Sequence, residues 1–152
     1  MKNLLPFVLC PAAPDNNNSV GKPASKLIGD KQLSNRAEVE AIVLKFVEAL
    51  NIDDASVVPL AKDVEYFGMF SPIPTCGESD VREYIDQIAP FMVNEAYGKM
   101  IIEGDSVAVM TSFDSVNGTH IEGAFFFEVD GDKISKIKAV FDTRQMFKGK
   151  DS

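Results

Sequence analysis

Apolar residues recur at helical spacing in two segments of the chain. The first is "SNRAEVEAIVLKFVEALN" (34–51), where Asn35 and Glu38 have the spacing of a capping box. The second is "ESDVREYIDQIAPFM" (78–92), in which Pro90 lies near the expected end of the helix. Between them, "IDDASVVPLAKD" (52–63) predicts a short additional helix. The apolar stripe of the first helix consists of Val39, Ile42, Val43, Phe46, Val47 and Leu50.

Alternating apolar and polar residues predict strands elsewhere. "VEYFGMF" (64–70) alternates before the second helical segment, and four further strands are expected at 94–102, 106–116, 119–129 and 133–143. These four are separated by "EGD", by Asn117-Gly118 and by "DGD", and Asn-Gly is the strongest short hairpin signal. They therefore form an antiparallel meander.

This order of elements predicts an α+β fold, in which three N-terminal helices pack on a strongly curved antiparallel sheet. The interior of such a cone is either a filled core or a blind pocket lined by the concave face. Residues 1–33 lack periodicity and are rich in Pro, Asn and Gly, so we expect a flexible N-terminal arm there. The folded domain is expected at 34–148, followed by a tail at 149–152.

Composition narrows the possible partners. A net charge of -8, without a visible basic patch, argues against nucleic acid binding. Cys10 and Cys76 do not make a disulfide framework, and with His120 as the single histidine no metal site and no cofactor are expected. No segment suggests a membrane span. The cytoplasm is the predicted location, and the alternative is a signal segment in "MKNLLPFVLCPAAP", whose apolar run is broken by Pro6.

Several motifs resemble those of the nuclear transport factor two-like superfamily. They are the order of elements, "FVEALN" on the first helix, the helix that follows Gly77, and "EVDGDKISKIKAVFD" near the end. The resemblance covers roughly 35–147, and "FDTRQMF" is most similar to the limonene epoxide hydrolase-like branch. The superfamily also includes SnoaL-like polyketide cyclases, ketosteroid isomerases and scytalone dehydratase. It hosts enzymes and non-enzymes alike, so it implies a fold more strongly than a reaction.

The catalytic residues of these enzymes are only partly matched. The limonene epoxide hydrolase pattern places its strand Asp on Asp114 and its Tyr on Tyr66, whereas its Arg, Asn and second Asp fall on Ser112, Gly68 and Ala139. The acid/base Asp of SnoaL-like cyclases also falls on Ala139. In the ketosteroid isomerase pattern, the base falls on Gly68. The resemblance therefore implies that chemistry, if present, is centred on Asp114.

Alternate residues of a strand share a face, which predicts the lining of an apolar pocket. If Asp114 faces inward, its pKa is expected to rise among apolar neighbours, which suits general acid/base work. Tyr66 would donate a hydrogen bond to it or to a substrate oxygen, and Ser112 would position water. The alternatives are a solvated Asp114 bonded to its hairpin and a Tyr66 that serves only the core. For the last two strands, the resemblance implies which face is inward. The expected substrate-binding residues are then Gly68, Met110, Ile121, Gly123, Phe125, Phe127, Ala139 and Phe141.

These residues suggest three functions. The first is a small-molecule enzyme of isomerase, cyclase or epoxide hydrolase type, acting on an apolar oxygenated substrate such as a terpenoid, polyketide or epoxide. The second is a non-catalytic binding protein for an apolar ligand, and the third is a dimeric interaction module with a filled cavity. The resemblance also implies a homodimer through the outer face of the sheet, to which Phe126 would contribute, and His120 is expected on the surface.

Overall fold

The computed structural model describes residues 30–147, and their side chains from residue 35 to residue 145. Residues 1–29 of the expected arm and the expected tail lie outside the described residues. Helix α1 runs from Asp30 to Ile52, so it begins earlier than the sequence pattern predicted. The predicted capping box is therefore wrong, because Asn35 and Glu38 lie inside the helix, where the Asn35 amide donates to Asp105 (3.4 Å).

The predicted second helix is also wrong, since a single 3₁₀ turn, η1 (Ala55–Val57), stands in its place. Asp53 has a left-handed backbone (φ 53°) directly after α1, and the Asp54 carboxylate accepts a hydrogen bond from the Ser56 amide (2.9 Å). Val58 is extended (φ -79°, ψ 123°), as expected of a residue that precedes a proline. The helical turn therefore cannot continue, and strand β1 follows at once.

Helix α2 (Glu78–Ile88) forms where the sequence predicted it, and its last turn tightens into η2 (Ala89–Phe91) around Pro90. Val81, Ile85 and Ile88 are its buried residues. Arg82 ties α2 to η1, because its guanidinium donates to the carbonyl oxygens of Ala55 and Val58. The position of α2 over the sheet is therefore fixed by both apolar and polar contacts.

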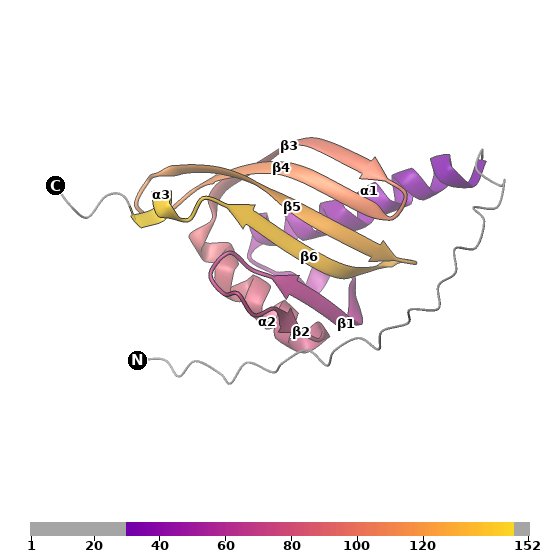
Figure 1. The fold of residues 1–152 in the computed structure, drawn as a ribbon, viewed down its shortest axis with the longest axis horizontal. Coiled ribbons are helices and arrows are strands. Elements are labelled where there is room, and N and C mark those ends of the chain that lie inside the picture. Colours follow the sequence, from indigo (N-terminus) through magenta and orange to yellow (C-terminus); the bar gives the residue numbers. More distant parts are fainter. Residues whose placement is uncertain (1–29, 148–152) are drawn as a thin grey trace.

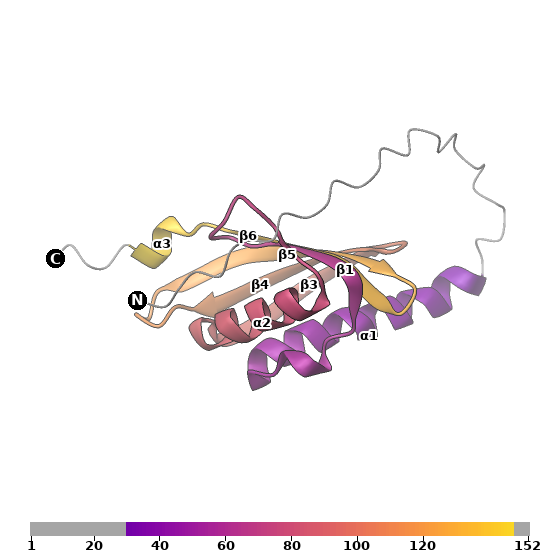
Figure 2. The same cartoon turned by 90° about the horizontal axis from the view of Figure 1, so that it is seen from below.

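Six strands form one sheet in the order β2-β1-β6-β5-β4-β3. The meander from β3 to β6 is antiparallel, but β1 pairs with β6 in parallel, so the expectation of a wholly antiparallel sheet is corrected to a mixed one. Both long helices cover the same face of the curved sheet (Figures 1 and 2). The strands are β1 (Leu60–Phe67), β2 (Thr75–Cys76), β3 (Val93–Glu103), β4 (Ser106–Asp114), β5 (His120–Asp130) and β6 (Lys133–Phe141), and a short helix, α3 (Arg144–Phe147), follows them.

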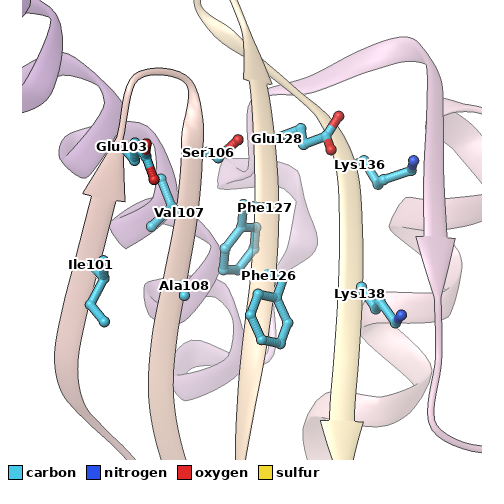
Figure 3. A pocket seen from close by; sticks show the side chains of 10 residues that line it. All are labelled: Ile101, Glu103, Ser106, Val107, Ala108, Phe126, Phe127, Glu128, Lys136 and Lys138. Atoms are coloured by element: carbon cyan, nitrogen blue, oxygen red, sulfur yellow. The ribbon is translucent and has the colours of Figure 1, made fainter.

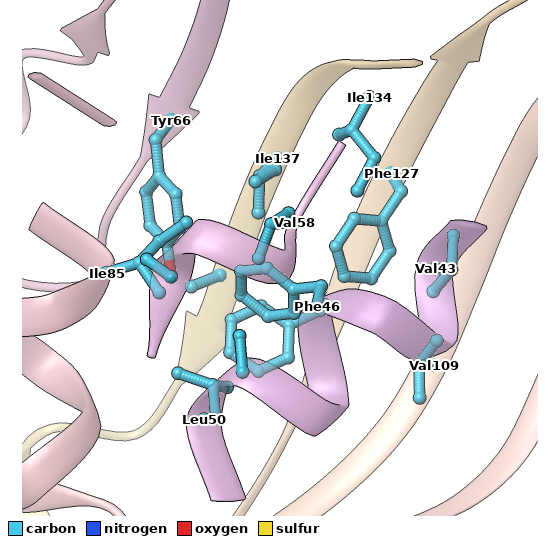
Figure 4. Close-up of a cluster of buried hydrophobic side chains, with 14 of the residues drawn as sticks. Val43, Phe46, Leu50, Val58, Tyr66, Ile85, Val109, Phe127, Ile134 and Ile137 are labelled. Carbon is cyan, nitrogen blue, oxygen red and sulfur yellow. The ribbon is translucent and has the colours of Figure 1, made fainter. Parts of the chain in front are cut away.

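One hydrophobic core lies between the helices and the concave face of the sheet (Figure 4). Phe46 of α1 is at its centre, with ring centroids 5.0 Å from Phe125 and 5.1 Å from Phe127 of β5. Phe141 of β6 extends this cluster, 5.3 Å from both Phe113 and Phe125. Edge-to-face contacts of this kind stabilise a core beyond the area they bury. The interior of the cone is thus filled largely by its own aromatic side chains.

Candidate functional site

The structure places Asp114, Ser112 and Met110 on the outer face of the sheet, so their predicted inward orientation is wrong. The buried residues of β4 are the alternate ones, Val107, Val109, Thr111 and Phe113. Asp114 is paired across the strands with His120, whereas Phe113 is paired with the buried Ile121. Residues paired in this way lie on the same face of a sheet.

The turn between β4 and β5 explains the error. A two-residue Asn-Gly turn would place Asp114 opposite Ile121. The hairpin instead closes with the Ser115 amide donating to the Thr119 carbonyl (2.9 Å), and Gly118 adopts a left-handed backbone (φ 84°) inside a wider loop. This loop shifts the register by one residue, which moves every side chain of β4 to the opposite face.

Asp114 is a surface carboxylate with two polar partners. It accepts a hydrogen bond from the Asn94 amide (3.0 Å) and lies 2.9 Å from Nδ1 of His120, whose side chain is 60% exposed. The hydrogen bonds from Asn94 and then from His120 lower the pKa of Asp114, against an opposing effect of desolvation. The expected rise of its pKa is therefore wrong, and the alternative of a carboxylate bonded to its own hairpin describes it better.

The predictions for the neighbouring strands agree with the structure. Ile121, Phe125 and Phe127 of β5 are buried, as is Ala139 of β6, and Phe141 is partly buried against them. Gly123 packs under the Phe141 ring so closely that a methyl group there would overlap both the ring and the Val140 carbonyl oxygen. These inward residues contact one another, so in this conformation they form core. Whether they also bind a substrate stays a prediction.

Tyr66 of β1 is 1% exposed and points into the core (Figure 4). Its hydroxyl has no hydrogen-bond partner among the described residues. Its ring meets that of Tyr84 from α2 edge-on (4.8 Å), and the Tyr84 hydroxyl occupies the space where a side chain at Gly68 would begin. Burial, followed by the charges of Tyr84 and Glu95, raises the pKa of Tyr66 well above its ordinary value. The Tyr66 hydroxyl is therefore protonated, and it is a hydrogen-bond donor without an acceptor among the described residues.

Glu95 of β3 is the functional candidate that the sequence pattern missed. Its Oε2 is buried without a partner in the described part of the chain, and the Thr111 hydroxyl lies 3.4 Å from its Oε1. Burial raises the pKa of Glu95 from 4.5 to about 7, despite the opposing contact with Thr111. A native protein rarely leaves buried polar atoms unpaired, and side chains with strongly shifted pKa values cluster at functional sites.

The other potential sites have fewer features of a functional site. Within residues 30–147, no group of three or more His, Cys, Asp or Glu side chains is placed to hold a metal ion. No helix in the same range is long and apolar enough to cross a membrane. Cys76 is disulfide-bonded, so its sulfur is not a free thiol, whereas no disulfide framework was expected from the sequence. The surface has a hollow on the outer face of the sheet and another beside the start of α2.

No protein-family model matches the chain, and no curated protein sequence matches it. Solved structures do match the chain. An NTF2-like protein from Cytophaga hutchinsonii is 20% identical over 72% of this chain and 95% of its own, with a TM-score of 0.60. A steroid delta-isomerase from Pseudomonas aeruginosa is 18% identical over 70% and 80%, with a TM-score of 0.62.

A third structure is SalBIII, an epoxide hydrolase/cyclase-like enzyme of pyran ring formation in the polyether salinomycin. It is 17% identical over 73% of this chain and 95% of its own, with a TM-score of 0.64. Identities this low establish the fold and leave the reaction open. The chain therefore has the nuclear transport factor two-like (NTF2-like) fold, as its motifs indicated.

Proposed function

We propose that the protein is a small-molecule enzyme that performs general acid/base chemistry with Glu95, acting on an apolar oxygenated substrate. The observation that carries this proposal is a pair of buried, unpaired polar atoms, the hydroxyl of Tyr66 and Oε2 of Glu95. Each costs stability when left unsatisfied, and a substrate oxygen and a substrate proton would satisfy both. The steroid delta-isomerase and SalBIII, which share the fold, support a reaction of isomerase, cyclase or epoxide hydrolase type.

The proposed roles follow from the protonation states. A carboxyl with a pKa of about 7 exchanges its proton readily near neutral pH, so Glu95 serves as the base that takes a proton from substrate or water and returns it later. Thr111 restrains one of its oxygens. Tyr66 stays protonated and donates to the oxygen on which negative charge develops. The predicted role of Tyr66 is thus kept in this proposal, and the role first given to Asp114 passes to Glu95.

A substrate needs space beside these groups. Tyr84 and Phe141 are only partly buried and lie against the core, so they are the aromatic side chains best placed to move aside. Apolar rings around a few polar groups are the usual composition of a small-molecule site. We expect a ligand to displace these rings while the Phe46 cluster beneath them stays packed.

The test combines turnover with binding. A ketosteroid with a movable double bond and an apolar epoxide serve as probes, with conversion followed by chromatography and binding by calorimetry. We expect Glu95→Gln to lose at least about 100-fold in turnover while it retains binding, as removal of a general base does. Glu122→Gln is the matched control, since Glu122 is an exposed carboxylate of β5. Equal turnover by wild type and Glu95→Gln would refute the role of Glu95, and binding without turnover would indicate a ligand-binding protein.

A second candidate function is the dimeric interaction module, and the outer face of the sheet favours it. Several large apolar side chains on this face are exposed, among them Ile101, Met110, Phe126 and Val140. Such a group of exposed apolar residues often marks a protein contact. A groove of about 430 Å³ on this face has Ile101 and Phe126 in its lining and is bordered by charged residues (Figure 3). We propose that a second copy of the chain covers this face.

The charges of the groove suit a second copy. Four residues are paired in succession across strands β3, β4, β5 and β6, which places Glu103 at one end of a row and Lys136 at the other. In order, they are Glu103, Ser106, Glu128 and Lys136. A two-fold axis parallel to the strands would place Glu103 of each copy opposite Lys136 of the other. Light scattering after gel filtration tests this: Phe126→Glu should convert a dimer to a monomer. Val116→Glu is the control, because Val116 is an equally apolar, exposed residue at the tip of a hairpin. A monomeric wild type would contradict the proposal.

A further inference from the structure

Strand β3 carries one extra residue beside Glu95. Val93 is paired with Asp114 and Ala96 with Ser112, so three steps along β3 match two steps along β4. The irregularity lies at Asn94 and Glu95, and Asn94 has a left-handed backbone (φ 53°). An extra residue in one strand of a pair, with one residue left-handed, is a β-bulge, and bulges next to active sites redirect side chains.

The bulge determines which way Glu95 points. In a regular strand Glu95 would share a face with Val93, which is exposed and paired with the outward Asp114. The extra residue puts Ala96 on the outer face beside Ser112, so Glu95 turns into the interior, where it meets Thr111. The burial of the Glu95 carboxyl thus depends on this local backbone shape.

Side chains on the outer face hold the bulge in place. The Asn94 amide donates to Oδ2 of Asp114 (3.0 Å), and Oδ1 of the same carboxylate is held 2.9 Å from His120. Left-handed backbone costs free energy for residues other than glycine, although asparagine tolerates it better than most. The hydrogen bond from Asn94 compensates for part of that cost, because it forms only while the Asn94 side chain lies over β4.

We propose that Asp114 is a positioning residue, which holds Asn94 in the bulge and thereby directs Glu95 into the interior of the protein. The catalytic meaning of this arrangement rests on the proposed function, but the arrangement itself does not. Asp114 acts from the solvent side of the sheet, and His120 restrains it there. The carboxylate of Asp114 on the outer face therefore determines the position of the Glu95 carboxyl in the interior.

The ionisation of Glu95, followed by NMR of ¹³C-labelled glutamate carboxyls, reports its position. In Asp114→Ala the bulge should relax, Glu95 should reach solvent, and its pKa should fall from about 7 towards 4.5. Asp114→Asn should keep the wild-type value, because its side-chain oxygen still accepts the hydrogen bond from Asn94. In Asn94→Gly the pKa of Glu95 is expected to lie between the values in these two variants. Glycine adopts the left-handed backbone freely, but it lacks the side-chain amide that donates to Asp114. Tyr66 and Tyr84 are the titratable side chains that face this interior region.

The controls separate geometry from charge. Glu122→Gln removes one negative charge from β5, whose Glu122 is paired with Ser112, without touching Asn94, and it should leave the Glu95 titration unchanged. Circular dichroism verifies that each variant is folded. Equal titrations in wild type and folded Asp114→Ala would overturn the proposal. A shift in Asp114→Asn as large as that in Asp114→Ala would also overturn it, because the loss of charge and not of the hydrogen bond would then be the cause. Because this readout needs no substrate, an absence of turnover would refute the proposed function alone.

Discussion

Replacing Glu95 by glutamine should remove a pH dependence from the stability of the fold. Glu95 is protonated more readily in the folded protein, where its pKa is about 7, than in the unfolded chain, where it takes its ordinary value of 4.5. Below about pH 4.5 the carboxyl is neutral in both states and costs nothing. As the pH rises from about 4.5 to about 7, the unfolded chain gains free energy from ionisation while the folded protein stays largely protonated, so stability is lost, and the loss is complete above about pH 7.

The size of the loss follows from the difference between the two values. Each unit of pKa difference corresponds to about 1.4 kcal/mol, so a difference between 4.5 and about 7 amounts to roughly 3 kcal/mol. Glutamine has a similar shape and cannot ionise. The free energy of unfolding of Glu95→Gln, relative to wild type, should therefore rise by roughly 3 kcal/mol between about pH 4.5 and about pH 7.5.

Urea unfolding of both proteins across this pH range, with the slope of the transition checked for constancy, measures that difference. Other titrating groups affect both proteins equally and cancel. Glu122→Gln, which removes an exposed carboxylate, should run parallel to wild type. Parallel curves for wild type and Glu95→Gln would show that Glu95 titrates like a solvated carboxylate, and would refute its burial.

Three further changes test the packing around the site. Phe125→Ala opens a cavity in the aromatic cluster and should lower the free energy of unfolding by about 3–5 kcal/mol; a loss near zero in urea unfolding would mean that the cluster is loose. Gly123→Ala drives a methyl group into the Phe141 ring and should cost about 1–3 kcal/mol in the same assay, and an unchanged value would contradict that close contact. Tyr66→Phe removes an unpaired buried hydroxyl and should raise stability by about 1 kcal/mol while turnover falls, whereas lower stability would mean that the hydroxyl has a partner.

The regular parts of the fold could be predicted from periodicity. The stripe on α1, the helix after Gly77 and the inward residues of β5 and β6 follow from side-chain spacing, because burial of one face dominates their energetics. The second predicted helix failed because Pro59 forces an extended backbone at Val58. The parallel pairing of β1 with β6 joins segments far apart in the chain, and no local pattern encodes it.

The site was harder to predict, for two local reasons. The wide turn around Gly118 shifts the pairing of β4 by one residue, so Asp114, which was expected inside, lies on the outer face. The bulge at Asn94 turns Glu95 to the inner face at the start of β3, and strand alternation alone gave no reason to single out Glu95. Each is an insertion of one residue into a two-residue repeat, and the repeat itself carries no sign of it. Tyr66 lies beyond the irregular part of β1, where the pairing with β6 is regular, and its expected inward position is confirmed.

The ionisation of Glu95 in the wild-type protein tests the central claim most directly. A ¹³C NMR titration of its carboxyl, assigned by comparison with Glu95→Gln, should show a midpoint at about 7, as expected of a carboxyl whose Oε2 is buried without a partner among the described residues. A midpoint near 4.5 would place the carboxyl in solvent and contradict the proposed chemistry.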